Sequence, residues 1–344
     1  MNGNESKPNQ PLLQAPKKKG PKVIATFFVL GLIVVSVGYL WINWKKPRLT
    51  PEKLSPELTT LIQNMPGTSD AMFYVGLKDI RDSRFWQEAV PDSLKETPFL
   101  SMGKRVDSLL AVSNINLTRD LDTLLISFQR SGIKEQKYIG MASGEFARKF
   151  PATALRAASL ETTEVAGRNA YELDSTLWVA PMGPNRLAIA SSSEMLEKFL
   201  RPSGHLLDRD APTAALIQKT PYKSHFWFTL PSPQWTAGAL QSITSKNSDV
   251  KSVGNLNRLQ QISMSVKFDD GLLGQSEWVY NDRQGAFFAS TFLWATIKLS
   301  TLGPRTSEAA KALLHHMKVQ QNLESVIITA DLPLEAFKKT SHKE

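Results

Sequence analysis

Histidines, paired carboxylates and hydroxyls are the residues to consider first for chemistry in this chain, whose 344 residues include no cysteine. Without thiols there is no disulfide, thiolate metal site or cysteine nucleophile. His315 and His316 are the obvious metal-ligating pair, but neighbouring residues on a helix point about 100° apart, whereas metal-binding helices use i, i+4 spacing. His205 and His225 stand alone. We therefore predict no metal site and no cofactor.

The paired carboxylates of the sequence have structural explanations. Asp120 and Asp122 flank the start of a predicted strand, and Asp269 and Asp270 precede Gly271 in a predicted hairpin turn. Acid–base catalysis needs two carboxylates facing one cleft, which no spacing here predicts. The chain contains no GxSxG, HExxH, P-loop or GxGxxG motif. We assign no catalytic residue, and a hydrolase is the least supported function.

Residues 23–44, VIATFFVLGLIVVSVGYLWINW, dominate the organisation of the chain. A hydrocarbon core of about 30 Å needs about 20 apolar residues of helix, and this stretch has that length without a charged side chain. A cleaved signal peptide is the rival interpretation. Its apolar core would be about 7–15 residues and would be followed by a small-residue cleavage site, which is missing here. We predict a single transmembrane helix that acts as an uncleaved signal anchor.

Basic charge is concentrated on both sides of the predicted span. Nine basic and two acidic residues precede position 54, whereas 32 basic and 30 acidic residues follow position 53, so the overall charge of +9 does not indicate a nucleic-acid-binding face. We predict that basic and aromatic side chains mark the membrane interface, namely Lys17, Lys18, Lys19, Lys22, Trp41, Trp44, Lys45 and Lys46.

The orientation of the span follows less directly, because basic residues flank both of its ends. A short N-terminal tail that stays inside is the common case. This favours a bacterial inner-membrane protein with its C-terminal domain in the periplasm. The opposite orientation stays open.

The rest of the chain predicts an α+β fold with a mainly antiparallel sheet. We divide the sequence into a disordered basic tail (1–22), the transmembrane helix (23–44), a Pro-rich extended linker (45–57) and two α+β units (58–208 and 209–344). AMFYVGL at 71–77 and HFWFTLP at 225–231 are both predicted to be aromatic strands followed by a helix and two strands. This repeated order suggests a duplicated unit.

Periodicity and turn residues place the individual elements. Predicted strands are 71–77, 121–129, 137–144, 162–167, 169–173, 175–182, 186–192, 225–231, 259–268, 272–280 and 323–332. Predicted helices are 56–63, 78–89, 99–112, 145–159, 193–200, 214–219, 232–245, 285–299, 307–319 and 333–339, with Ser193 as an N-cap and Pro151 as a kink or boundary.

Three features give the chain a loose family resemblance. They are the N-terminal span before an aromatic strand, the run KYIGMASGEFARKF leading to EVAGRNAYEL, and RLAIASSSEMLEKFL. Together these features resemble uncharacterised bacterial single-span membrane-anchored proteins with a tandem α+β extracytoplasmic domain. The resemblance covers about residues 70–340 and implies fold and topology, but it implies no site residue.

The segment AFFASTFLWATI at 286–297 is uncharged and too short to span a bilayer. It is interpreted first as a core helix under the sheet. The alternative is an apolar ligand or partner surface built from Phe287, Phe288, Phe292 and Trp294.

These observations support two function hypotheses ahead of the hydrolase. The first is a membrane-anchored extracytoplasmic binding or scaffold protein that contacts another envelope protein. The second is a carrier or sensor of an apolar, lipid-like ligand that uses helix 286–297 and nearby Trp278. Bilayer contact through residues 23–44 is common to both, and the sequence predicts neither the partner's identity nor the oligomeric state.

Overall fold

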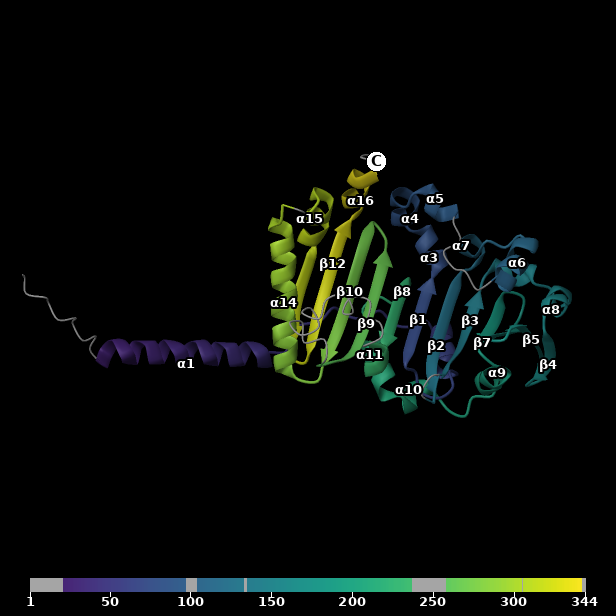
Figure 1. The fold of residues 1–344 in the computed structure, drawn as a ribbon, viewed down its shortest axis with the longest axis horizontal. Helices are drawn as coiled ribbons and strands as arrows, with labels where there is room; N and C mark the ends of the chain where they lie inside the picture. The colour runs from purple at the N-terminus through teal and green to yellow at the C-terminus, as the bar shows by residue number, and fades with distance from the viewer. Residues whose placement is uncertain (1–20, 97–103, 133–134, 237–257, 305, 342–344) are drawn as a thin grey trace, which may run out of the picture. The chain divides into compact units, whose positions relative to one another are not determined.

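One antiparallel sheet of twelve strands runs through the folded part of the protein in the computed structural model (Figure 1). The structure describes residues 21–96, 104–132, 135–236, 258–304 and 306–341, and in the first helix it describes side chains from Leu30 onward. The chain divides into two compact units, Met1–Trp44 and Lys45–Glu344. The sheet belongs entirely to the second unit, which confirms the predicted α+β class.

The order of strands across the sheet shows how the second unit is assembled. From one edge to the other, the strands are β11 (Met317–Asn322), β12 (Ser325–Pro333), β10 (Gly271–Tyr280), β9 (Leu259–Phe268), β8 (Phe226–Leu230), β1 (Ala71–Gly76), β2 (Thr123–Ser131), β3 (Glu135–Ser143), β7 (Arg186–Ala190), β6 (Leu177–Pro181), β5 (Arg168–Asp174) and β4 (Glu161–Val165). Every neighbouring pair is antiparallel.

β1 and β8 lie side by side at the centre, with Phe73 opposite Phe228. Each is followed outward by the next hairpin in the sequence, which is β2–β3 beside β1 and β9–β10 beside β8. The repeated element order predicted for residues 58–208 and 209–344 therefore corresponds to two stretches that extend one sheet in opposite directions. That the two stretches arose by duplication stays a prediction.

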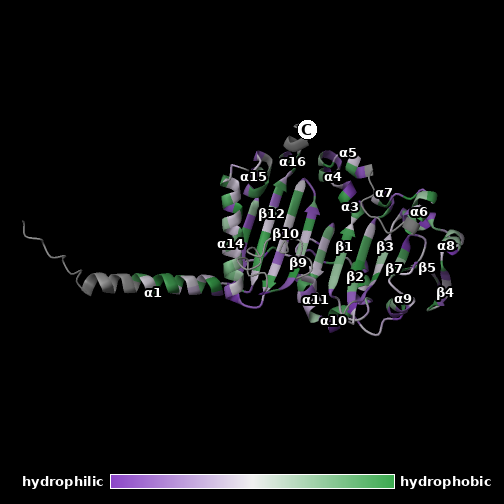
Figure 2. Ribbon diagram, viewed as in Figure 1, coloured by the Kyte–Doolittle hydropathy of each residue, from purple (hydrophilic) through white to green (hydrophobic). Residues whose placement is uncertain are grey.

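Both faces of the sheet are apolar near its centre, because residues that alternate along the strands pack into different hydrophobic clusters. Figure 2 shows hydrophobic residues along the strands of the sheet. On β8, Trp227 points to one face and is fully buried, whereas Phe226 and Phe228 point to the other face and are half-buried. An antiparallel sheet with two apolar faces needs cover on both sides.

Helices supply this cover in three groups. The Trp227 face packs on α2 (Pro56–Gln63), α9 (Ser193–Leu200), α10 (Leu206–Arg209) and α11 (Ala211–Lys219). At the β2–β7 end, the opposite face packs on α6 (Lys104–Val112), α7 (Leu117–Asp120), η1 (Glu145–Lys149) and α8 (Ala152–Ala158). At the β10–β12 end, it packs on α14 (Arg283–Leu302), which in turn contacts α15 (Glu308–His315).

Short helices complete the unit at the ends of the strands. They are α3 (Leu77–Asp82), α4 (Arg84–Ala89), α5 (Asp92–Glu96) and α16 (Leu334–Ser341). The predicted helix 78–89 is split in two because the Ser83 hydroxyl caps α4 by accepting from the N–H of Trp86. The predicted helix 145–159 is likewise divided into η1 and α8 by Phe150 and Pro151.

Other predictions need correction or fall outside the description. Helix α9 is capped by Ser192, whose hydroxyl accepts from the N–H of Met195, and not by Ser193. The predicted helix 307–319 ends at His315, and Met317–Asn322 forms strand β11 instead. Residues 99–103 and most of the predicted helix 232–245 lie outside the described residues.

The first unit contains helix α1 (Pro21–Asn43), which covers nearly all of the predicted span. Its large apolar side chains from Leu30 to Trp41 are exposed. Among the residues that the structure describes, a search for helices with the length and hydropathy of a membrane span finds none. The transmembrane assignment of residues 23–44 therefore stays a prediction.

The linker that follows α1 is fixed to the second unit. The side chain of Asn322 exchanges two hydrogen bonds with the backbone of Lys46, at 3.0 and 3.2 Å. The Arg48 guanidinium forms a bidentate ion pair with Glu277, a carboxylate that is 1% exposed and also accepts from Ser325. Further along, the N–H of Glu52 donates to the carbonyl of Pro221. The linker lies against the domain, and its last two predicted residues, Pro56 and Glu57, begin α2. That the linker is extended stays a prediction.

Candidate apolar-ligand site

An apolar cavity of about 130 Å³ lies between the sheet and the helices at the β2–β7 end. The helical side and its adjoining loops contribute Val106, Leu110, Leu117, Leu121, Phe146, Phe150 and Leu155. The sheet contributes Leu124, Ile126, Ala142, Leu173, Leu177, Val179, Leu187 and Ile189. Every lining residue is hydrophobic, so the wall offers no side chain for acid–base or nucleophilic chemistry.

Two sequence periods build this wall. Along β2, Leu124 and Ile126 face the cavity while Leu125 points to the opposite core, as the two-residue period of a strand requires. On the helical side, Val106 and Leu110 are four residues apart in α6, so they share one face of that helix. The cavity is therefore the meeting place of several amphipathic elements, each of which directs its apolar side inward.

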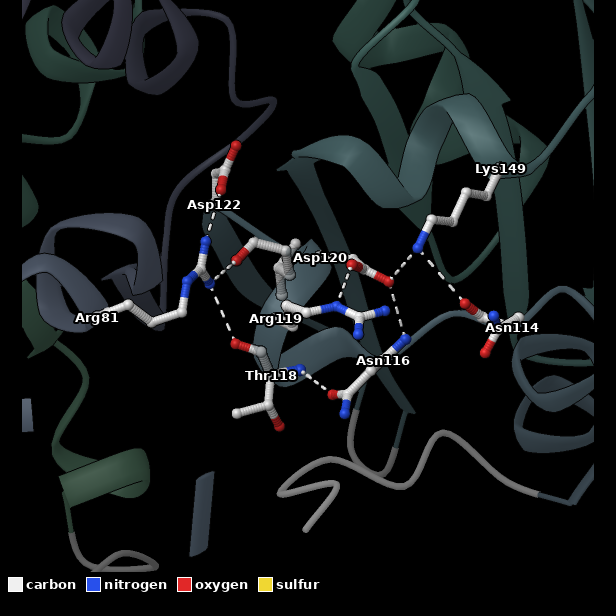
Figure 3. A network of polar contacts seen from close by, with 9 residues as sticks. Arg81, Asn114, Asn116, Thr118, Arg119, Asp120, Asp122 and Lys149 are labelled. Carbon is white, nitrogen blue, oxygen red and sulfur yellow. Dashed lines mark hydrogen bonds and ion pairs between the residues drawn. The ribbon is translucent and has the colours of Figure 1, made fainter. Parts of the chain in front are cut away.

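An ion-pair network around the buried carboxylate of Asp120 connects two of the wall segments (Figure 3). Asp120 at the end of α7 accepts from the Lys149 ammonium of η1 at 2.6 Å and from Arg119 at 3.0 Å. It also accepts from the N–H of Asn116 at 3.0 Å, and the Asn116 side chain caps α7 by accepting from the N–H of Thr118. The Asp120 carboxylate thus connects α7, which contributes Leu117 to the cavity wall, with η1, which contributes Phe146.

Asp120 is unsuited to acid–base chemistry at neutral pH. Burial acts to raise the pKa of this carboxyl, but the hydrogen bonds from Arg119, Lys149 and the backbone of Asn116 outweigh burial and lower the pKa to about 2. Asp122 has a separate partner, because Arg81 donates to it at 2.7 Å and also donates to the carbonyls of Thr118 and Leu121. The two carboxylates do not form a dyad.

The other titratable residues singled out in the sequence are also accounted for by local structure. Asp269 and Asp270 occupy the β9–β10 turn, where Asp270 pairs with Arg84 at 2.8 Å. His315 and His316 are exposed at the end of α15. Nδ1 of His225 accepts from the N–H of Phe268 at 2.9 Å, and burial lowers the pKa of this imidazole. Across the described ranges, no group of three or more potential metal ligands is found.

The residues predicted as an apolar surface lie on α14, away from the cavity wall. Phe288 and Trp294 are 58% and 53% exposed, while Phe287 and Phe292 are half-buried. The interpretation of 286–297 as a core helix holds only for the face that carries Ala286 and Ala289. Trp278, expected to share a ligand site with this helix, lies half-buried on β10 and donates to Ser276 at 2.9 Å.

The predicted membrane-interface residues lie mostly in or near α1. Lys17, Lys18 and Lys19 are outside the described residues, and the side chain of Lys22 is not described. Trp41, Trp44 and Lys45 are exposed, and Lys46 is half-buried.

A second hollow, open and polar, has a volume of about 450 Å³ and lies near Asp122, Asn185 and Arg186. Its charged groups already pair with protein partners, since Arg186 binds Glu57 at 2.5 Å and Asp122 binds Arg81. We therefore treat the apolar cavity as the candidate site.

Comparison with known proteins identifies no family. No protein-family model matches the chain, and no curated protein matches it. Among solved structures, crystal form I of TP0453 aligns with 84% of this chain and 97% of that one, at 11% identity and a TM-score of 0.42. A likeness of this strength supports no inference about function.

Sequence reasoning did not find the cavity. Its lining comes from elements between Val106 and Ile189, and each contributes one or two hydrophobic residues of the kind found in any core. The only local signal was the amphipathic pattern, which predicts burial and does not predict an unfilled space.

Proposed function

We propose that the protein is a membrane-anchored extracytoplasmic binding protein whose folded domain holds a small apolar ligand, or one apolar segment of a lipid-like ligand, in the cavity between sheet and helices. The observation that carries the proposal is the wholly hydrophobic lining of this space. An engineered apolar cavity of about 150 Å³ in another protein stays dry and binds benzene or xenon, which gives the size of group expected here.

The energetic cost of the space supports a ligand. Unfilled apolar space deprives the side chains of its wall of packing contacts, which costs stability. A bound apolar group restores contacts along the wall and recovers part of that cost.

The proposed cellular location of the protein rests on helix α1 and on the basic residues before and after it. The sequence from residue 23 to residue 42 has no charge, and the described apolar side chains of α1 are exposed, as those of a helix surrounded by lipid would be. Basic residues before and after the helix suit the headgroup layers. We place the domain outside the cytoplasmic membrane by the common orientation of such anchors.

Xenon tests whether the cavity accepts an apolar guest. Crystals of the full chain, pressurised with xenon, are expected to show density against Phe146, Leu155 and Ile189. Ala142→Leu fills the space from the sheet side and is expected to remove that density. Ala111→Leu is the matched control, because it makes the same change at an exposed position of α6, a helix that lines the cavity. Ordered water in the cavity, or no guest at all, would contradict the proposal.

A scaffold role remains the other function that the sequence predicts. It requires an exposed surface able to bind a second protein, and the exposed apolar side of α14 is one such surface. The position of α14 relative to the linker favours a different occupant, which is argued next.

A further inference from the structure

Helix α14 carries an apolar stripe on its outer side. Phe288, Leu299 and Leu302 are 58%, 69% and 80% exposed. At 100° per residue they lie within about 60° of one another around the helix axis. Trp294, 53% exposed, lies about 80° from Leu302 on the same outer side. We call Phe288, Leu299 and Leu302, with Trp294, the α14 stripe.

The helix that carries the stripe has no negative charge. The 20 residues from Arg283 to Leu302 include two basic residues and no Asp or Glu. Lys298 is exposed. Exposed Phe, Leu and Trp side chains beside a cationic residue are residue types that helices on a membrane surface present to the acyl chains and headgroups.

The linker is bonded to the domain near the start of α14. Only Trp44 and Lys45 separate the last residue of α1 from Lys46, whose backbone is bonded to the side chain of Asn322. The neighbouring Gln321 donates from its side chain to the carbonyl of Arg283, the first residue of α14. The chain thus joins the domain at the same end of the sheet from which α14 begins.

The same linker has little freedom to move away. Arg48 is held by the buried carboxylate of Glu277, which Lys219 also approaches to 3.8 Å. Releasing Arg48 would leave a carboxylate that is 1% exposed without its bidentate partner, which is unfavourable. The chain from Lys46 onward is therefore bonded into the folded domain, and only Trp44 and Lys45 separate it from the last residue of α1.

We propose that the α14 stripe is a second membrane contact, which seats the domain on the lipid surface. This inference rests on residues 23–44 spanning the bilayer, and it is independent of the cavity. A protein partner or a second copy of the chain would bury the same side chains and is the competing occupant. The bilayer is favoured because only two residues connect the predicted span to Lys46, which is bonded to the domain near the start of α14, and because the helix has no negative charge.

The absence of native cysteine allows a direct test. Single variants Leu299→Cys, Val35→Cys and Val112→Cys of the full chain are labelled with an environment-sensitive fluorophore and reconstituted into phosphatidylcholine vesicles that contain doxyl lipid as a quencher. Val35 reports the predicted span, and Val112, 84% exposed on α6, is the matched control on the other end of the domain.

The proposal predicts blue-shifted, lipid-quenched emission at positions 299 and 35 and neither effect at 112. We expect Trp294→Asp to reduce the quenching at 299 at least twofold and to leave position 35 unchanged. Quenching at 35 alone would overturn the stripe contact and keep the anchor. Quenching at neither position would overturn both. A blue shift at 299 without lipid quenching would identify a protein or a second copy as the occupant and would also overturn the proposal.

Discussion

The two ends of the sheet are covered on the same face in opposite ways. At the β2–β7 end, α6, η1 and α8 direct Leu and Phe side chains toward the sheet and leave a cavity of about 130 Å³. At the β10–β12 end, α14 directs Gly285, Ala286 and Ala289 toward the sheet and turns Phe288 outward. Small residues let a helix approach a sheet closely, whereas large ones keep it at a distance. Large hydrophobic residues therefore line an interior cavity at the β2–β7 end and form an exposed surface at the β10–β12 end.

A pair of identical substitutions gives the largest expected contrast between the two ends. Leu155 is fully buried on the cavity wall, so Leu155→Ala enlarges the cavity and is expected to cost about 3–5 kcal/mol of unfolding free energy. Leu299 is 69% exposed, and Leu299→Ala is expected to change stability by less than about 0.5 kcal/mol. Denaturant unfolding of the full chain measures both. Equal losses at the two positions would contradict the comparison.

The ion pairs of Asp120 are expected to be the next largest contribution at the cavity end. The pKa of Asp120 is lowered from 3.8 to about 2, so the folded state gains stability above pH 4 and loses it as the pH falls from about 4 to about 2. At neutral pH this corresponds to about 2 kcal/mol, which Asp120→Asn should remove. Asp122→Asn, at a side chain 36% exposed, is the control and should cost less. Urea unfolding at pH 7 and pH 3 would show whether the acid-dependent loss disappears in Asp120→Asn.

Substitutions that add side-chain volume are expected to destabilise the β10–β12 end more than the β2–β7 end, the opposite of the Leu→Ala pair. Ala289 packs against the sheet with 1% exposure, so Ala289→Leu is expected to destabilise the domain by at least about 1 kcal/mol. Ala142→Leu places the same side chain in an existing cavity and should be nearly neutral or stabilising. Thermal unfolding compares the two variants. If Ala142→Leu were the more damaging change, the cavity would not be free to accept a group of that size.

The smallest expected effect concerns His225, the residue immediately before β8 at the centre of the sheet. Burial lowers the pKa of His225 in the folded state, so the unfolded state takes up a proton first as the pH falls below about 6.5. Stability therefore declines as the pH falls from 7 toward 5.5. His225→Gln keeps an acceptor for the N–H of Phe268 and should remove this part of the pH dependence. An unchanged pH profile in the variant would assign the dependence to another group.

Much of the sheet could be predicted from the sequence, because alternation and turn residues act locally. Strands β9 and β10 follow directly from the apolar alternation through Ile262 and Met264 and from the Asp269–Gly271 turn. Strand β11 was missed because Met317–Asn322 contains Lys and Gln, which suit a helix. Its strand conformation depends on pairing with β12, which is a tertiary contact.

The candidate site could not be predicted in the same way. The lack of charge in residues 286–297 can be read directly from the sequence, and the segment was interpreted first as a core helix. In the structure only its small residues are buried, so hydrophobicity alone did not indicate which side faces the sheet. The cavity depends on how closely α6, η1 and β7 approach one another, and no sequence period encodes an interhelical distance.

The central claim is that the cavity holds an apolar ligand, and photo-crosslinking tests it most directly. A fatty acid carrying a diazirine on its chain is mixed with the full-length protein in lipid vesicles and irradiated, and the modified peptides are identified by mass spectrometry. The account predicts modification of the peptides around Phe146–Leu155 and Leu187–Ile189, and its loss in Ala142→Leu but not in Ala111→Leu. Modification confined to α1 and α14, with the cavity wall unlabelled, would show contact with the bilayer alone and would contradict a ligand-binding cavity.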